Sequence, residues 1–522
     1  MKRVVIIGAG PAGLTAGVEL LEKSSEYEVI ILEESNQAGG ISRTVRHNGK
    51  RMDIGGHRFF SKDRDVNKWW LDRMPLQGAK SYDDKILGRE SELSADGPDP
   101  EKEDNVMLSR TRISRIYYKH HFFDYPVKMN WNTIKNMGFF SFLSAGVSYL
   151  KSVIWKRPED NLENFYINRF GRKLYSMFFE KYTEKLWGRH PDVISADWGA
   201  QRVKGLSVFA ILRDIITKGI FGKRRKQVET SLIEQFLYPK YGPGQLWENA
   251  AKEFTDKGGT ILYGAKVTRF QTQNDEISEV IFQRDGKEEQ IQSDIVISSM
   301  PLKDLMAGLP DVPKDIAGIA KGLPYRDFVT VGIEVGSLAL QNKTRRKTLN
   351  NIVPDCWIYV QDGEVKLGRV QIFNNWSPYM LPEPEKTVWL GLEFFCTEGD
   401  RFWNMSPEEW KELGAAELRK LKIITPEEEI LDFHCEKVKK AYPAYFDTYN
   451  EIDRLIDFLT VHCKNLYCIG RNGQHRYNNM DHSMETAFQA VSNILTGRQQ
   501  KDNVWNVNTE QEYHEVCSAK EE

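Results

Sequence analysis

The sequence is poor in cysteine and has no excess of charge, and both features exclude classes of protein. Its 522 residues contain six cysteines, and no two of them form a C-x-x-C pair. We therefore expect neither a disulfide framework nor a cysteine-rich zinc site, and a reducing compartment, the cytoplasm, fits best. The 72 Lys and Arg residues nearly cancel the 74 Asp and Glu residues, which leaves a net charge of −2. Neither nucleic acid nor an anionic membrane is therefore expected as a general partner.

Long apolar runs are missing as well. Residues 1–7 lead directly into a glycine-rich loop and are too short for the apolar core of a secretory signal. The most apolar long stretch is Met137–Leu150, whereas a helix that spans a membrane needs about 20 residues. We predict a buried core helix there, with a helix lying on a membrane surface as the alternative. The protein is expected to be soluble, with no stable membrane span.

What is present is an ordinary globular composition, with 40% hydrophobic and 28% charged residues, enough for two or three domains. Ser406 and Thr425 each precede a Pro-Glu-Glu run, so each is predicted to start a helix. The other expected elements follow from apolar periodicity. They are strands at Arg3–Ile7, Tyr27–Leu32, Thr260–Phe270, Glu279–Asp285, Glu289–Ser298, Phe328–Val335, Val388–Phe395 and Leu466–Ile469, and helices at Pro11–Lys23 and Ser483–Leu495.

A G-x-G-x-x-G motif stands between the first predicted strand and helix. Gly8 permits the tight turn, Gly10 lets the backbone approach a pyrophosphate, and Gly13 lets the helix pack closely on the strand. Glu33 ends the second strand, where a carboxylate accepts hydrogen bonds from a ribose hydroxyl and disfavours a 2′-phosphate. The motif therefore predicts a dinucleotide site, with NADP as the poorer candidate.

Glu33 leads into a glycine pair that ends in Gly40 and is followed by the basic residue Arg43. This arrangement places backbone and a cation near a cofactor's phosphates, although it is also typical of a turn before a hairpin. The stretch resembles the second dinucleotide motif of the flavin amine oxidase and protoporphyrinogen oxidase superfamily. The resemblance implies FAD as the cofactor, bound by Gly40 and Arg43 among others.

A second glycine pair, Gly55-Gly56, is followed by His57. It resembles the G-G-H segment of UDP-galactopyranose mutases, which implies that Gly56 and His57 face the flavin ring. The alternative is a solvated loop. The run from Tyr182 to Trp187, with Arg202 after it, resembles the uridine side of the mutase site, and the alternative for its aromatic residues is a helical core.

The segment from Gly470 to Ser483 follows an apolar strand and precedes a helix. It resembles the mutase motif in which a Gly-Arg pair is followed by a spaced tyrosine and a Met-Asp pair. The resemblance implies that Gly470 and Asp481 serve the flavin and that Arg471 and Tyr477 hold the substrate diphosphate. Asp481 has a structural alternative as the cap of the last helix.

The resemblance implies an α/β fold, with a Rossmann-like FAD-binding domain and a discontinuous α+β substrate domain that contains a helical subdomain. It makes His57, Arg471 and Tyr477 the catalytic residues. The predicted segments are 1–62, 225–300 and 462–500 for the FAD-binding domain, 63–224 for the helical subdomain, 301–461 for the substrate domain and 501–522 for a tail.

The implied activity is that of an isomerase that interconverts pyranose and furanose forms of a nucleotide sugar, through an adduct on N5 of the reduced flavin, for surface polysaccharide or lipopolysaccharide synthesis. It implies a nucleotide sugar as substrate and a flavin reductant such as NAD(P)H. One departure matters: Glu334 stands where the mutases carry a second diphosphate arginine, and Arg326 or Arg369 would have to replace it.

Because of Glu334, an FAD-dependent oxidoreductase of the amine oxidase, protoporphyrinogen oxidase or desaturase type is the alternative. A flavin-bound protein without turnover is a third reading. No metal is expected, since His120, His121, His475 and His482 lack carboxylates or thiols at metal-ligand spacing.

Overall fold

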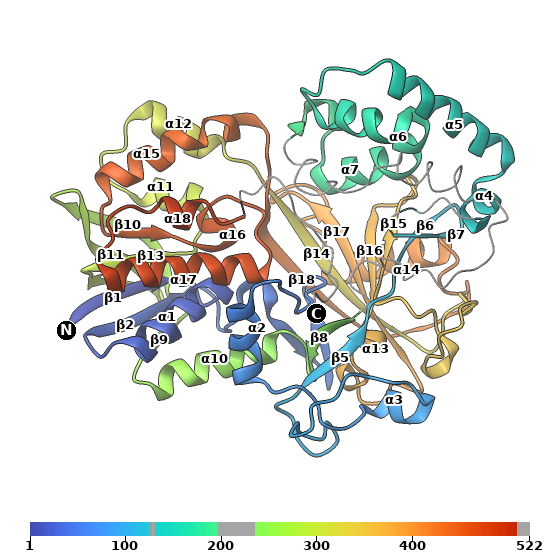
Figure 1. Ribbon diagram of the computed structural model, residues 1–522, viewed down its shortest axis with the longest axis horizontal. Coiled ribbons are helices and arrows are strands. Elements are labelled where there is room, and N and C mark those ends of the chain that lie inside the picture. The colour runs from blue at the N-terminus through green and yellow to red at the C-terminus, as the bar shows by residue number, and fades with distance from the viewer. Residues whose placement is uncertain (126, 128–130, 197–234, 509–522) are drawn as a thin grey trace, which may run out of the picture.

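The computed structural model of the protein describes residues 1–125, 127, 131–196 and 235–508 (Figure 1). Two large sheets dominate the molecule, one near the chain ends and one built from the middle of the chain, and a group of helices covers the second sheet. Arg202 and the tail beyond residue 508 lie outside the described residues.

The first sheet has five parallel strands in the order β19-β13-β1-β2-β9. Both of its faces are covered, as is usual for parallel sheets, so alternate residues of β1 enter two different apolar cores. Val4 and Ile6 pack toward α1, α10 and α17, and Val5 and Ile7 pack toward the opposite side. The strands are β1 (Lys2–Ile7), β2 (Tyr27–Glu33), β9 (Thr260–Tyr263), β13 (Ile295–Ser298) and β19 (Leu466–Cys468), and the helices are α1 (Pro11–Lys23), α10 (Gly244–Asp256) and α17 (Met480–Thr496).

The opposite side of this sheet is closed by a small antiparallel sheet and by three helices. These elements are β10 (Lys266–Gln273), β11 (Glu276–Arg284), β12 (Lys287–Gln292), α11 (Leu302–Gly308), α12 (Lys314–Gly322) and α15 (Ile452–His462).

The second sheet has seven strands in the order β18-β14-β17-β16-β15-β6-β7, and only the β15–β6 pair is parallel. Its faces differ because side chains alternate along each strand. One face is aliphatic and packs on α14 (Pro407–Lys420), while the other carries aromatic and charged residues. The strands are β6 (Ser114–Tyr118), β7 (His121–Asp124), β14 (Tyr325–Val335), β15 (Trp357–Val360), β16 (Leu367–Ile372), β17 (Val388–Cys396) and β18 (Ile430–Pro443).

The helices above the second sheet include the apolar stretch singled out in the sequence. It forms most of α5, in which Ala145, Tyr149 and Ser152 are buried while most of the other side chains are exposed, so the prediction of a core helix is wrong. Among the described residues, no helix is both long and apolar enough to cross a membrane. The helices are α4 (Trp131–Met137), α5 (Phe139–Ile154), α6 (Leu162–Phe178) and α7 (Glu180–Trp187).

Short elements join these layers. The segment 63–224, predicted as largely helical, also supplies three strands, and two of them extend the seven-stranded sheet. The remaining elements are β3 (Thr44–His47), β4 (Lys50–Asp53), β5 (Met107–Thr111), β8 (Gln235–Pro239), α2 (Arg64–Arg73), α3 (Tyr82–Leu87), α13 (Phe373–Trp376), α16 (Gly470–Gly473) and α18 (Asp502–Trp505).

The two predicted helix starts have different outcomes. Ser406 begins α14, and the predicted capping box with Glu409 is confirmed. The prediction at Thr425 is wrong, because the chain turns there and enters β18 at Ile430, where pairing with Val335 of β14 overrides the local capping pattern.

The last long helix begins at Met480, slightly earlier than predicted. Its capping box is formed by Asn479 and His482, so Asp481 is a residue of the first turn and not the cap. The predicted α/β fold class is confirmed, since a parallel sheet with helices stands beside a larger, β-rich part.

Candidate functional site

The first motif forms a backbone cradle between β1 and α1. Gly8 has φ +99°, a conformation that L side chains rarely adopt, and a Cβ at Gly13 would lie 1.9 Å from the Gly8 carbonyl oxygen. Gly10 faces Gly40, since a Cβ at Gly40 would lie 3.2 Å from the Gly10 Cα. Two glycine loops therefore approach backbone to backbone at the start of α1, where free N–H groups favour a phosphate.

Glu33 closes one side of this cradle. Its carboxylate is buried and accepts hydrogen bonds from the Ala9 N–H at 2.7 Å and from the Ser35 N–H at 2.9 Å and hydroxyl at 2.7 Å. A carboxylate offers about four acceptor positions, so one is left for a ribose hydroxyl. Arg43 lies nearby and donates to the Gly40 carbonyl at 3.1 Å, while its guanidinium pairs with Glu436 at 3.6 Å.

The C-terminal segment meets the same cradle. Gly470 has φ +73°, and a Cβ there would lie 3.0 Å from the Ala12 Cβ in the first turn of α1. The Gly470 N–H donates to the Thr486 hydroxyl of α17 at 2.8 Å, which ties the segment to that helix. These positive φ values and close backbone approaches suit the long, flat shape of a flavin dinucleotide, so the residues present fit the predicted cofactor.

The G-G-H loop lies on the aromatic face of the seven-stranded sheet. A Cβ at Gly56 would lie 2.3 Å from the Trp357 ring, and one at Gly55 would lie 3.9 Å from Phe328. The His57 Nδ1 is 3.0 Å from the Gly55 carbonyl oxygen. Burial, together with the charges of Arg471 and Arg369, lowers the pKa of His57 to about 4, so the ring is neutral near pH 7.

Arg471 is held rigidly beside two stacked tyrosines. Its Nε donates to the Asn478 carbonyl at 2.8 Å and its Nη1 donates to the Ala441 carbonyl at 3.1 Å. The Tyr442 and Tyr477 rings are stacked, with centroids 5.7 Å apart and an interplanar angle of 10°. The Arg471 guanidinium lies 4.7 Å from the Tyr477 centroid, within cation–π distance.

A second buried arginine reaches the same place from β16. The Arg369 Nε donates to the Tyr182 hydroxyl at 2.8 Å, and its Nη1 pairs with Glu393 at 3.2 Å. The Arg369 guanidinium lies 6.0 Å from the Tyr442 centroid. Burial alone would lower the pKa of Arg369, but Tyr182, Tyr442 and Glu393 raise it well above its usual value, so the guanidinium stays charged.

These side chains form what we call the arginine–tyrosine cluster. Its members are His57, Tyr182, Arg369, Glu393, Tyr442, Arg471 and Tyr477. Burial raises the pKa of Glu393, although Arg369 and Gln371 oppose that shift, and burial likewise raises the pKa of Tyr182 to about 12.

Glu334 is not in the cluster. It lies six residues beyond Phe328 on β14, about 20 Å along the strand. Its carboxylate accepts from Lys50 Nζ at 2.9 Å and from the Thr387 hydroxyl at 2.8 Å, so its charge is compensated locally. Of the two arginines named as replacements, Arg369 lies in the cluster, whereas the Arg326 Nε donates to the Leu186 carbonyl at the end of α7.

The residues predicted for the uridine side are separated. Tyr182 reaches the cluster, whereas Trp187 is 3% exposed and packs in the helical core beside Phe446. Arg202 lies outside the described residues. The roles assigned to these residues from the sequence stay predictions.

Sequence reasoning missed Glu393 and Tyr442. A signal for Glu393 was present, since it is a single carboxylate inside the apolar run Val388–Cys396, where an unpaired charge would be costly. Its partner Arg369 stands opposite it in the β16–β17 register. For Tyr442, no comparable signal exists before the register of β18 is known.

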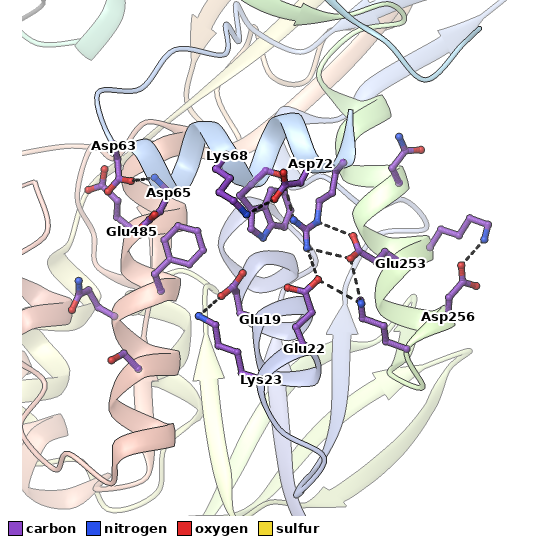
Figure 2. Close-up of a pocket in the computed structure, with 18 of the residues that line it drawn as sticks. Glu19, Glu22, Lys23, Asp63, Asp65, Lys68, Asp72, Glu253, Asp256 and Glu485 are labelled. Atoms are coloured by element: carbon purple, nitrogen blue, oxygen red, sulfur yellow. Dashed lines mark hydrogen bonds and ion pairs between the residues drawn. The ribbon is translucent and has the colours of Figure 1, made fainter. Parts of the chain in front are cut away.

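A separate groove of about 1210 Å³ lies on the outer side of the five-stranded sheet, between α1, α2, α10 and α17 (Figure 2). Figure 2 shows that its lysine and arginine side chains are paired with carboxylates. Arg73 contacts Glu22 at 3.0 Å and Glu253 at 2.7 Å, and Lys23 contacts Glu19 at 2.6 Å. The groove contains none of the predicted site residues, and we assign it no function.

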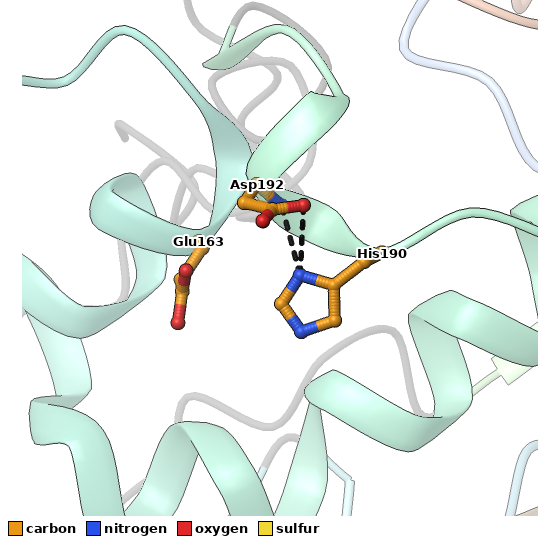
Figure 3. A group of neighbouring side chains, drawn as sticks. All are labelled: Glu163, His190 and Asp192. Carbon is orange, nitrogen blue, oxygen red and sulfur yellow. Dashed lines mark hydrogen bonds and ion pairs between the residues drawn. The ribbon is translucent and has the colours of Figure 1, made fainter.

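Glu163, His190 and Asp192 place their potential ligand atoms within 4.8 Å of one another (Figure 3). The His190 Nδ1 is 2.9 Å from Asp192, and Glu163 pairs with Arg172 at 3.2 Å. Burial lowers the pKa of His190, but Asp192, Glu180 and Glu184 more than offset this and raise it. The raised pKa favours a protonated imidazole that pairs with these carboxylates over a neutral metal ligand.

Curated relatives match parts of the chain. Coproporphyrinogen III oxidase of Staphylococcus aureus (strain NCTC 8325 / PS 47) is 22% identical over 310 residues, which cover 53% of this chain and 59% of that enzyme. The 1-hydroxycarotenoid 3,4-desaturase of Flavobacterium sp. (strain P99-3) is 39% identical over 59 residues, 11% of this chain and 12% of that enzyme. Each match therefore spans less than two thirds of the relative's own length.

Solved structures share the fold over nearly the whole chain. A structure of reduced UDP-galactopyranose mutase superposes with a TM-score of 0.75 at 21% identity and covers 98% of this chain and 100% of its own. A putative protoporphyrinogen oxidase from Exiguobacterium sp. 255-15 gives a TM-score of 0.66 at 16% identity, with 95% and 99% covered. These likenesses confirm the predicted α/β fold class.

The sequence pattern described as flavin containing amine oxidoreductase matches residues 11–495, almost the full length. This range includes Gly13 of the first glycine motif, the Gly40 loop and the Gly470 segment, whose geometry fits a flavin dinucleotide. The cofactor is FAD, and the chain belongs to the flavin-containing amine oxidoreductase family.

Proposed function

We propose that this FAD enzyme isomerises a nucleotide sugar, in the manner of UDP-galactopyranose mutase. The observation that carries the proposal is the positive charge of the arginine–tyrosine cluster. Arg369 and Arg471 contribute two positive charges, and Glu393 removes at most one of them. Because His57 is neutral near pH 7, the cluster keeps a net positive charge and favours an anionic substrate over an amine.

The cluster supports diphosphate binding by its geometry as well as its charge. A guanidinium has five N–H donors, and the two backbone carbonyls bonded to Arg471 take two of them. The remaining donors are preorganised for phosphate oxygens, a charge-assisted contact that suits arginine. Tyr182 and Glu393 fix Arg369 in the same way from the other side.

FAD, when bound, supplies a redox-active ring that is also able to attach covalently to a substrate carbon. The chain's own residues position that reaction. Gly56 and His57 bring backbone and a neutral imidazole close to the aromatic face of the seven-stranded sheet, and the tyrosine stack excludes water beside Arg471. The proposal includes a flavin reductant such as NAD(P)H, a cytoplasmic location and a role in surface polysaccharide synthesis.

Titration of the dithionite-reduced, FAD-loaded enzyme with UDP tests the proposal. Wild type is expected to bind UDP, and Arg471→Ala is expected to bind it about 10- to 150-fold more weakly while keeping its FAD, because one charged hydrogen bond is lost. The matched control is Arg269→Ala, which removes an exposed arginine of β10 that pairs with Glu288. If wild type does not bind UDP, the mutase proposal is overturned.

A net oxidoreductase that acts on a carboxylated ring compound is the second candidate. One feature favours it: flat rings suit the face formed by Phe328, Trp357 and Tyr442. The similarity to coproporphyrinogen III oxidase of Staphylococcus aureus is in line with such a substrate. Appearance of porphyrin absorbance from coproporphyrinogen under air, with no UDP binding, would decide for this candidate.

A further inference from the structure

Helix α5 presents an apolar face to solvent. Phe139, Leu143, Val147, Leu150 and Ile154 follow one another at intervals of three or four residues, so they form a single stripe along the helix. All five are exposed, and Phe140 and Trp155 at the edges of the stripe are 85% and 69% exposed. Figure 1 places α5 at the outer edge of the molecule, and its buried residues pack toward α6.

This orientation is the reverse of an ordinary surface helix. Small and polar residues, Ala145 and Ser152, face the protein together with Tyr149, while the large apolar side chains point outward. An exposed apolar surface of this kind marks an interaction site and not a packing accident, because each such side chain would gain from leaving water.

The charged residues of α5 and the segments that flank it are cations, up to the acidic pair Glu159-Asp160. From residue 125 to residue 158 the sequence contains five Lys and Arg residues and no Asp or Glu. Four of these cations, Lys135, Lys151, Lys156 and Arg157, are exposed, and among the described residues none of them forms an ion pair with a carboxylate. Lys156 instead donates to the backbone carbonyl of Asn168, and Arg157 donates to the side-chain oxygen of Asn164.

We propose that α5 lies in the surface of an anionic lipid bilayer, with its apolar stripe among the acyl chains and its cations at the headgroups. The helix has 16 residues and is about 24 Å long, too short to span a bilayer but suited to lying in its surface. Trp155 and the flanking cations sit where an interfacial helix places them. This inference does not depend on the substrate of the flavin site.

The charge distribution favours a lipid surface over a second copy of the chain. Two copies joined through this stripe in a symmetric dimer would bring their cations together, whereas anionic headgroups neutralise them. Binding is therefore expected to require anionic lipid and to weaken in high salt.

Co-sedimentation of the full-length, FAD-loaded protein with vesicles tests the inference. The vesicles are phosphatidylcholine alone and an equimolar mixture of phosphatidylcholine and phosphatidylglycerol. Wild type is expected to bind the mixture and not phosphatidylcholine alone. The double variant Phe140→Glu/Leu150→Glu is expected to lose at least about tenfold in partitioning, because two apolar contacts become charged. Flavin content and the visible spectrum should not change, which shows that the variant folds.

The matched control is Ile86→Glu/Val461→Glu, which changes two exposed apolar residues on α3 and α15, 52% and 55% exposed. It is expected to bind the anionic vesicles like wild type. A second pair, Lys135→Gln/Lys151→Gln against Lys287→Gln/Lys314→Gln, should show a loss only for the first. Absence of wild-type binding, equal loss in the variants and their controls, or a dimer in light scattering that Phe140→Glu/Leu150→Glu dissociates would each overturn the proposal.

Discussion

The two large sheets offer binding groups of different kinds. The five-stranded parallel sheet is buried on both faces, and its binding groups are backbone atoms exposed by Gly8, Gly10 and Gly40. The seven-stranded sheet carries aromatic and charged side chains on one face, and the binding group that we propose there is the side chain of Arg369, which pairs with Glu393. One sheet positions its ligand through the absence of side chains and the other through their alternation.

The difference explains what a sequence reveals. A glycine motif is local, so six consecutive residues of the sequence are enough to predict the cofactor cradle. The arginine–tyrosine cluster includes side chains from β16, β17, β18 and α7, which meet only after the strands are paired in register. Cofactor binding and substrate binding are therefore expected to respond separately to substitution.

Gly10→Glu is expected to abolish FAD binding, because a side chain and a negative charge would enter the space between Gly10 and Gly40. The purified variant should be colourless, as measured by its absorbance near the flavin bands. The control is Gly318→Glu, at an α12 position where a new Cβ meets no atom within 4 Å. A yellow Gly10→Glu protein with full flavin content would contradict the cradle assignment.

Asp53 lies at the junction of the two sheets, where it accepts hydrogen bonds from the hydroxyls of Thr44, at 2.8 Å, and Tyr238. Burial raises its pKa from 3.8 to about 7, although both hydrogen bonds act in the opposite direction. The folded state thus binds a proton more tightly than the unfolded state does, and this contribution to stability is lost as the pH rises from about 4 to about 7.

Asp53→Asn is expected to remove that loss. The free energy of unfolding of the variant, measured in urea across this pH window, should fall by less than that of wild type, with a difference of at most about 4 kcal/mol. Asp311→Asn, at an exposed position, should keep the wild-type slope. Parallel slopes for wild type and Asp53→Asn would show that Asp53 ionises in the folded protein as easily as in the unfolded one.

Arg369→Ala is expected to weaken UDP binding about 10- to 150-fold without loss of FAD, since it removes one of the two positively charged groups of the cluster. Titration of the reduced enzyme measures the effect, and Arg326→Ala is a control for an arginine of the same sheet outside the cluster. Equal losses in both variants would mean that the fold, and not the charge, was affected.

Tyr477→Phe is expected to have the smallest effect. The ring stays stacked on Tyr442, and the hydrogen bond to the Tyr445 hydroxyl uses the Tyr477 backbone N–H, so only the phenolic hydroxyl is lost. UDP affinity should fall by no more than about tenfold. A greater fall, with the flavin spectrum unchanged, would assign the hydroxyl a larger part in substrate binding than the stack has.

Most of the fold followed from the sequence, because apolar alternation and glycine motifs are local signals. The strand at Phe328–Val335 and the capping box at Ser406 are examples. Two errors came from tertiary context. At Thr425 strand pairing outweighed a capping pattern, and α5 turned its apolar side away from the protein, which periodicity alone does not reveal.

The candidate site was predictable in part. Arg471, Tyr477, His57 and Tyr182 meet in one cluster, and Glu334 does not join them. Without the register of β14 and β16, the place of a residue along its strand is unknown. The sequence therefore does not show that Arg369 lies in the cluster and that Glu334 lies outside it. Glu393 depended on the same register.

The order of strands in the five-stranded sheet also governs how the protein is made. Its edge strand β19 and the helix α17 come from the last part of the chain, whereas β1 and α1 come from its first residues. During synthesis the first glycine loop therefore waits for residues 466–496 before its sheet is complete, and contacts so distant in sequence form slowly. Until then the apolar face of α1 has no α17 to cover it, so the nascent chain exposes apolar surface that the finished protein buries.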